Sequence, residues 1–292
     1  MFKKSMLFAA ALLAGTSLGA QAGTVTPVTN TPLDGVVYGF LLTDGSLLFQ
    51  GGFLQDFYRF KPDSKGSYVN GSLYPAAALP ANYIPYATSG GVLPDGRVLL
   101  IGGEYVLEAN NTLAFSFTNK IAIYNPKADT WTMVAPPFGP NWGFIGDSPW
   151  TILPNGHVLL GEKFSNAMAE FDPQTLTWTN VSSHAKDDVF AEEGLTLLPD
   201  GSVLTVNMTD FNFAQRFIPS ANPANSYWVG AGSTPVKLPV TDTNSATNIV
   251  YDNGMRVYHP PGEIGPAILR PDGTVFNSGA ACTVKGPATG LA

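Results

Sequence analysis

The feature that most constrains this chain is a short motif that returns five times. Each copy is an apolar run, an Asp-Gly or Asn-Gly pair and a second apolar run, and the pairs begin at Asp44, Asp95, Asn155, Asp200 and Asp272. Such pairs accept the positive φ angles of a tight hairpin turn, so each copy predicts two antiparallel strands. Because the copies recur at a period of about 50 residues, they predict a repeat protein.

A second signature follows the hairpins, and it adds two strands to each repeat. An apolar strand ends in Asn-Pro or Asp-Pro, and a strand with a central Trp comes next; the clear copies are Pro126 with Trp131 and Pro173 with Trp178, and weaker ones end at Pro62 and Pro219. A strand cannot continue its ladder through proline, so the chain must turn there. Four strands per repeat at this period are typical of a β-propeller blade.

We therefore predict an all-β propeller of about five recognisable four-stranded blades. The blades are expected to start near residues 36, 87, 147, 192 and 263, with the last one incomplete. The segment 24–28 aligns with the Trp-bearing strands, so Val25 is a candidate to close a five-bladed ring from the N-terminal side. Closure would cover strand edges that an open ring exposes. The alternative, which we favour, is a shortened relative of a larger ring, because the composition changes abruptly after Gly279 and no fourth strand follows the last hairpin.

The glycine pair Gly102-Gly103, Tyr124 and Trp131 together resemble the kelch repeat, over roughly residues 36–279. The pair recurs at 51–52 and is replaced by residues 161–162 in the third repeat. Three further phrases, at 145–149, 192–195 and 263–273, are similar to those of secreted bacterial kelch proteins in the galactose oxidase-like superfamily. This resemblance implies a kelch-type propeller, and it implies a fold more than a function.

The N-terminal segment has the pattern of an export signal. Lys3 and Lys4 precede an apolar stretch, and small residues stand before a cleavage point at Ala22. We expect residues 1–22 to be a cleaved signal peptide, residues 23–292 to form the propeller, and the protein to be secreted or periplasmic. No later stretch approaches the roughly 20 apolar residues of a membrane span.

Charge and cysteine content exclude other classes. The chain has 22 acidic and 15 basic side chains, a formal net charge of −7, which argues against a nucleic-acid partner. Cys282 is the only cysteine, so no internal disulfide can form and the core alone must hold the fold.

The resemblance implies one enzymatic alternative, a copper-radical oxidase of the galactose oxidase type, whose site needs two histidines, two tyrosines and a cysteine bonded to one tyrosine. The three histidines are His157, at a hairpin turn, and His184 and His259, in expected loops, while Cys282 follows the last hairpin. This placement does not suit a convergent copper site. Other catalytic motifs are absent from the sequence. We predict no catalytic residues and no cofactor.

Acidic residues give the best candidate site. Asp147, Glu192 and Glu193 stand seven or eight residues before their turns, and Glu263 stands nine before its own, where the first strand of each blade begins. First strands surround a propeller axis, so these carboxylates are expected to share one mouth of the channel. There they would attract a cationic ligand, with calcium as a further option. The alternative is that they are solvated loop acids.

Aromatic side chains in loops are the other candidates, with Trp142 and Tyr86 chosen as stacking faces and space-filling between blades as the alternative. The function that these observations favour is a secreted binding or scaffold protein that recognises a carbohydrate or an envelope or extracellular protein through one rim. The oxidase and a non-functional truncated propeller remain the alternatives.

Overall fold

The computed structural model describes residues 24–108, 112–181, 190, 192–206, 213–236, 249–252, 255–258 and 264–279. Within these residues the only helices are two 3-10 turns, η1 (Pro140–Gly143) and η2 (Pro223–Asn225). Neither these nor any other described segment forms an apolar helix of the length needed to cross a bilayer.

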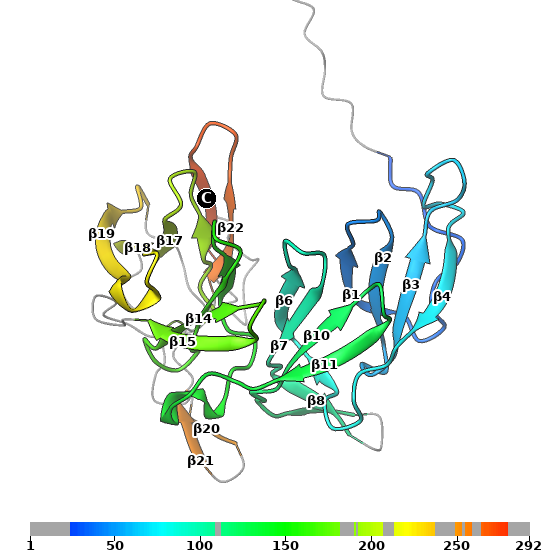
Figure 1. Ribbon diagram of the computed structural model, residues 1–292, viewed down its shortest axis with the longest axis horizontal. Coiled ribbons are helices and arrows are strands. Elements are labelled where there is room, and N and C mark those ends of the chain that lie inside the picture. The colour runs from blue at the N-terminus through cyan, green and yellow to red at the C-terminus, as the bar shows by residue number, and fades with distance from the viewer. Residues whose placement is uncertain are drawn as a thin grey trace, which may run out of the picture.

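Four antiparallel sheets of four strands each form the body of the molecule. From the first to the fourth strand, blade 1 is β1 (Val36–Leu41), β2 (Leu47–Gly51), β3 (Phe57–Lys61) and β4 (Ser72–Ala76), and blade 2 is β6 (Ser89–Val92), β7 (Val98–Ile101), β10 (Ile121–Asn125) and β11 (Thr130–Val134). Blade 3 is β12 (Trp150–Ile152), β13 (Val158–Gly161), β14 (Met168–Asp172) and β15 (Thr177–Val181), and blade 4 is β16 (Thr196–Leu197), β17 (Val203–Val206), β18 (Phe213–Ile218) and β19 (Tyr227–Ser233). The blades follow one another in chain order, from blue blade 1 to yellow blade 4 (Figure 1). The all-β propeller is thereby confirmed.

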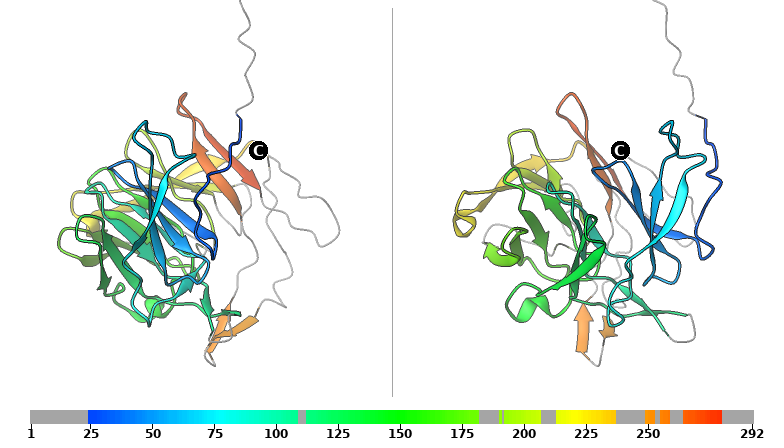
Figure 2. Two further views of the ribbon diagram at one scale, coloured as in Figure 1. Left: turned by 90° about the vertical axis from the view of Figure 1, so that its right-hand side faces the viewer. Right: turned by 45° about the vertical axis from the view of Figure 1, so that its right-hand side comes forward.

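A fifth hairpin, β22 (Ile264–Leu269) with β23 (Val275–Gly279), follows the four complete blades. Its first strand packs beside the first strand of blade 4, as a fifth blade requires. Two further small sheets were not expected from the sequence. They are the hairpin of β20 (Ile249–Asp252) and β21 (Met255–Tyr258), and a three-stranded sheet of β5 (Pro85–Tyr86), β8 (Tyr105–Leu107) and β9 (Leu113–Phe115). Figure 2 shows the two orange hairpins at opposite ends of the molecule.

The five predicted turns all form hairpins, and their glycines explain why. Gly45 and Gly96 have φ angles of +79° and +87°, and the other three turn glycines lie between +83° and +84°. A residue with an L side chain rarely adopts this left-handed backbone conformation. Glycine adopts it without strain, so it allows the tight turn that joins the two strands of each hairpin.

The predicted Trp strands also form, and each Trp ring ties its blade to the one before. Trp131 packs on Tyr124 with 5.1 Å between ring centroids, and its Nε1 donates to the Ala77 carbonyl at 2.8 Å. In blade 3, Trp178 packs on its own third strand and donates to the Ala135 carbonyl at 2.9 Å. Both carbonyls come directly after the fourth strand of the preceding blade, so blades 2 and 3 share this contact, whereas the buried Trp228 Nε1 of blade 4 does not make it.

The core lies between neighbouring sheets and follows the two-residue period of the strands. In β7, Val98 and Leu100 join a buried cluster with blade 1, whereas Leu99 and Ile101 join one with blade 3. Both faces of this strand are therefore covered, which is why its sequence is a continuous apolar run.

The predicted N-terminal outer strand is wrong. Residues 24–28 lie outside every strand, and the Val25 side chain is 93% exposed. Instead the backbone amide of Thr29 donates to the Val69 carbonyl at 2.9 Å, beside blade 1. Polar bonds to blade 1 thus hold this segment. The residues after the fifth hairpin, 280–292, lie outside the described residues.

Candidate functional site

The two ends of the blades differ, and each is named here for what it carries. The turn rim is the end with the hairpin turns at 44–45, 95–96, 155–156 and 200–201. The loop rim is the opposite end, where the first strands begin and the second strands end. Antiparallel pairing of first and second strands places these two sets of residues at opposite ends.

A single lysine lies at the centre of a cluster on the loop rim. The Nζ atom of Lys163 is 2.5 Å from Asp147 Oδ1, 2.7 Å from Glu192 Oε1 and 3.0 Å from Glu104 Oε1. The lysine side chain is only 1% exposed, and the three carboxylates are between 10% and 24% exposed. We call these four residues the Lys163 cluster. It connects the loops of blades 2, 3 and 4.

The Lys163 cluster carries net negative charge. Burial by itself lowers the pKa of the Lys163 ammonium, but the charges of Asp147, Glu192 and Glu104 outweigh it and raise the pKa well above its usual value. The lysine is therefore charged at every physiological pH. Three carboxylates surround one ammonium, so the cluster has a formal charge of −2.

Glycines bring the blade 2 and blade 3 loops together at this point. Gly102 and Gly103 follow β7, and the amide of Gly103 donates to the Gly146 carbonyl at 2.7 Å. A Cβ atom on Gly102 would lie 2.0 Å from that carbonyl oxygen, so only glycine allows the approach. Asp147 is the next residue along the chain, and this backbone contact holds it beside Lys163.

One aromatic ring contacts the lysine, and further rings extend from it. Its Nζ lies 5.5 Å from the centroid of the Phe117 ring, a favourable cation–π distance. Phe117 contacts Phe115 edge to face at 4.6 Å, and Phe115 contacts Tyr105 at 5.5 Å. Tyr105 and Tyr86 meet at 6.0 Å across the small sheet of β5, β8 and β9. Half-buried aromatic faces thus stand next to the charged groups.

The structure gathers some of the predicted acidic residues here and separates others. Asp147 and Glu192 both bind Lys163. The prediction that Glu193 shares their position is wrong, because its carboxylate is buried and accepts the Thr205 hydroxyl at 2.5 Å within blade 4. Glu263 lies outside the described residues.

The two predicted aromatic candidates lie in different parts of the structure. Trp142 is 3% exposed and packs in the core between blades 2 and 3, so its proposed role as a stacking face is wrong. It lies on η1, which follows Pro136 and Pro137 in the chain. Tyr86 is half-buried beside Tyr105, next to the Lys163 cluster.

Sequence reasoning missed both Lys163 and Glu104. Counted from the turn glycines, the Gly102-Gly103 pair of blade 2 corresponds to Glu162-Lys163 in blade 3, one residue beyond the position assigned from the sequence. A charged pair at a site that holds two glycines in blades 1 and 2 was the signal that could have identified Lys163. Glu104 directly follows the glycine pair of blade 2, and its position became visible only with the small sheet that buries it.

The carboxylates of Glu104, Asp147 and Glu192 offer oxygen atoms within 4.8 Å of one another, the one such group of metal-type ligands among the described residues. The Lys163 ammonium stands between them, so a cation would have to displace it. His157, the histidine that falls in the described part, lies on the turn rim with its Nδ1 2.7 Å from Glu170. His184, His259 and Cys282 lie outside it.

Comparisons with known proteins agree with this architecture. No family model matches the chain, and no curated protein sequence matches it. Among solved structures, the protein YjhT aligns with a TM-score of 0.51 and 14% identity over 71% of this chain and 68% of its own. A fungal alcohol oxidase of the AA5 family, in complex with copper, aligns with a TM-score of 0.52 and 15% identity over 83% of this chain. This chain covers 57% of the oxidase's length. At these identities the likeness shows the propeller fold alone.

Proposed function

We propose that this chain is an exported kelch-type propeller that binds a carbohydrate at the Lys163 cluster. The observation that carries the proposal is the combination at one rim of a fixed, net-negative charge cluster with half-buried aromatic faces. The predicted signal peptide at residues 1–22 supports export, and the glycine pairs and Trp strands support the kelch type.

The chemistry favours a ligand with many hydroxyl groups. Asp147 binds Lys163 through Oδ1, and its side chain is 23% exposed, so the carboxylate can still accept a hydroxyl from outside. Tyr86 and Tyr105 add flat faces on which a sugar ring can stack. Because Lys163 holds the carboxylates in place before binding, little conformational entropy is lost when a ligand arrives.

Binding to a glycan microarray tests this proposal, with the chain from residue 23 as the probe. We expect at least one glycan class to bind, and Tyr105→Ala to lower that affinity by roughly tenfold, the scale of one lost aromatic contact in a binding hot spot. Tyr74→Ala is the matched control, since Tyr74 is an exposed tyrosine on the outer strand of blade 1. No bound glycan, or equal losses in both variants, would overturn the proposal. An envelope protein as the ligand would then be the remaining binding function.

The copper oxidase stays a second candidate through fold likeness only. Its test is separate: copper measured in the purified protein, and peroxide production on primary alcohols. Stoichiometric copper together with peroxide release would replace binding by catalysis as the function of this chain.

A further inference from the structure

The turn rim carries three hollows, one between each pair of neighbouring complete blades. Their volumes are about 270 Å³ between blades 1 and 2, 280 Å³ between blades 2 and 3, and 360 Å³ between blades 3 and 4. Each is lined by two successive hairpin turns and by a proline corner; these prolines are Pro126, Pro173 and Pro219. The backbone therefore forms the same kind of hollow between each pair of blades. The three hollows differ in the side chains that line them.

The first hollow differs from the others in charge. Its lining has three cations, Arg59, Arg97 and Lys127, against two aspartates. The second has two aspartates with His157, and the third pairs one aspartate with one arginine. A surplus of positive charge thus occurs in one of these three equivalent places, on a chain whose formal net charge is −7. We call this hollow the Lys127 pocket.

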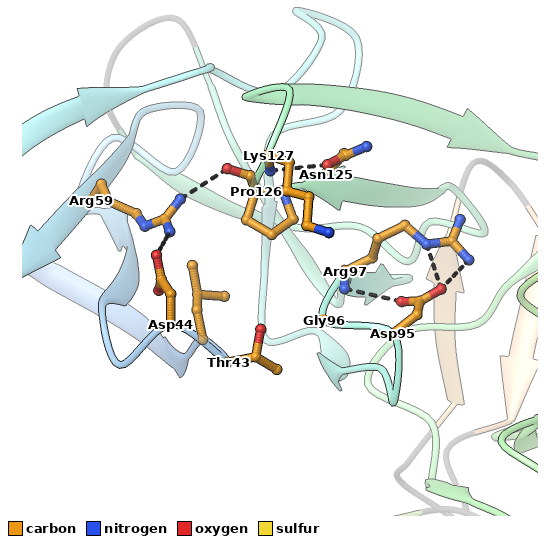
Figure 3. Close-up of a pocket in the computed structure, with 10 residues that line it drawn as sticks. Thr43, Asp44, Arg59, Asp95, Gly96, Arg97, Asn125, Pro126 and Lys127 are labelled. Carbon is orange, nitrogen blue, oxygen red and sulfur yellow. Dashed lines mark hydrogen bonds and ion pairs between the residues drawn. The ribbon is translucent and has the colours of Figure 1, made fainter.

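Both arginines of the Lys127 pocket are already paired. Arg59 Nη2 lies 2.5 Å from Asp44, and Arg97 Nε donates to Asp95 at 2.8 Å. Lys127 extends between these two pairs (Figure 3), and its ammonium makes no ion pair or hydrogen bond with any residue in the described ranges. The lysine is exposed, so the fold does not need this charge.

The two aspartates remain ionised and keep their capacity to accept hydrogen bonds. Partial burial alone would raise the pKa of the Asp44 carboxyl, but bonds from Ser46 and the Arg59 charge lower it. In the same way, bonds from Arg97 outweigh burial and lower the pKa of Asp95. The Asp44 side chain is 55% exposed, so a ligand can reach it.

We propose that the Lys127 pocket binds a small polyhydroxylated carboxylic acid of the uronic acid kind. Its carboxylate would pair with Lys127, and its hydroxyls would donate to Asp44 and Asp95. Inorganic phosphate offers these carboxylates fewer hydroxyl donors than a sugar acid does, and its higher charge is repelled by them. A neutral sugar leaves the ammonium without a counter-charge. The pocket volume of about 270 Å³ lies just below the roughly 300–1,000 Å³ of ligand pockets, which suits a ligand of one sugar ring.

Calorimetric titration of the chain from residue 23 tests this inference with D-glucuronate, D-glucose and inorganic phosphate as probes. We expect glucuronate to bind in roughly the millimolar range and at least about fivefold tighter than glucose or phosphate. Lys127→Ala should lower the glucuronate affinity by about tenfold, as for a lost charge-assisted contact. Lys61→Ala, which removes another exposed lysine on blade 1, should leave it unchanged.

Equal binding of glucuronate and phosphate would overturn the role of the hydroxyls. If glucuronate does not bind at concentrations up to about 20 mM, the proposal that this pocket binds a sugar acid is wrong. The same conclusion follows if the Lys127→Ala variant binds glucuronate as well as the native chain does. The Lys127 pocket and the Lys163 cluster are on opposite rims, so Tyr105→Ala should leave glucuronate binding intact. Failure at one rim is therefore distinguishable from failure at the other.

Discussion

The turn rim and the loop rim are built by opposite kinds of contact. On the turn rim, Asp44 Oδ1 accepts the backbone amide of Ser46 at 3.0 Å, two residues away, and the same bond recurs at the other four hairpins with distances of 3.0 to 3.1 Å. On the loop rim, Lys163 binds residues 16, 29 and 59 positions away. Local bonds repeat with the motif, whereas the Lys163 cluster occurs once and joins three blades.

The difference also separates exposed from buried charge. Pairs on the turn rim keep one partner in water, where an ion pair contributes at most about 1 kcal/mol. Lys163 is buried among three carboxylates, so the loss of one partner leaves charges without compensation. The repeated rim should therefore tolerate change, and the unique cluster should not.

The largest effect is expected from Lys163→Met. It leaves three carboxylates within 4.8 Å of one another, and we expect it to lower the free energy of unfolding by about 3–5 kcal/mol at pH 7. The deficit relative to the native chain should shrink towards pH 4, because protonation relieves the repulsion. Urea unfolding at both pH values measures this. Lys127→Met is the control and should change stability by less than about 0.5 kcal/mol.

The turn glycines should give the next largest effect. Gly45→Ala places a Cβ at φ +79° with no neighbouring atom within 4 Å, so the cost is backbone strain alone, about 1–2 kcal/mol. Gly96→Ala adds an approach of 2.9 Å to the Thr43 hydroxyl, which is exposed and can rotate away. We expect the two melting shifts to agree closely, and a much larger shift for Gly96→Ala would show that the turns are not interchangeable.

Breaking a turn-rim pair should have a smaller effect. Arg59 binds Asp44 and also donates to the Pro126 carbonyl of blade 2 at 3.1 Å. A double-mutant cycle of Arg59→Ala and Asp44→Ala should give a coupling of about 0.5–1 kcal/mol that decreases with added salt. A coupling as large as that expected for Lys163 would abolish the contrast between the rims.

The smallest expected effect is a change in how the free energy of unfolding falls at acid pH. The pKa of Asp95 is lowered in the folded chain, so its contribution is present above its ordinary pKa of 3.8 and is lost as the pH falls through the lowered value. Asp95→Asn should therefore flatten the stability curve slightly below about pH 4. The effect is well under 1 kcal/mol because solvent screens this partly exposed pair. If the Asp95→Asn variant shows the same pH dependence of stability as the native chain below about pH 4, the bond between Asp95 and Arg97 contributes nothing to the free energy of unfolding.

The sequence predicted the features that local chemistry decides. Asp-Gly pairs, proline corners and Trp strands each act within a few residues, so the four-stranded repeat was readable from them. Asp147 and Glu192 were found because both precede a first strand. Lys163 was missed because its partners are distant in sequence, and Trp142 was misassigned because burial of a loop ring depends on both neighbouring blades. Val25 was misassigned to a strand because the sequence match of its segment to the Trp-bearing strands does not show whether a partner strand lies beside it.

Reductive methylation of the native chain, read by peptide mass spectrometry, tests most directly whether Lys163 is the buried centre of the loop rim. A charged, inaccessible ammonium does not react, whereas an exposed lysine does. We expect Lys127 to be methylated within minutes, while Lys163 stays unmodified until the protein is unfolded. Methylation of Lys163 at the rate of Lys127 in the folded protein would contradict this expectation.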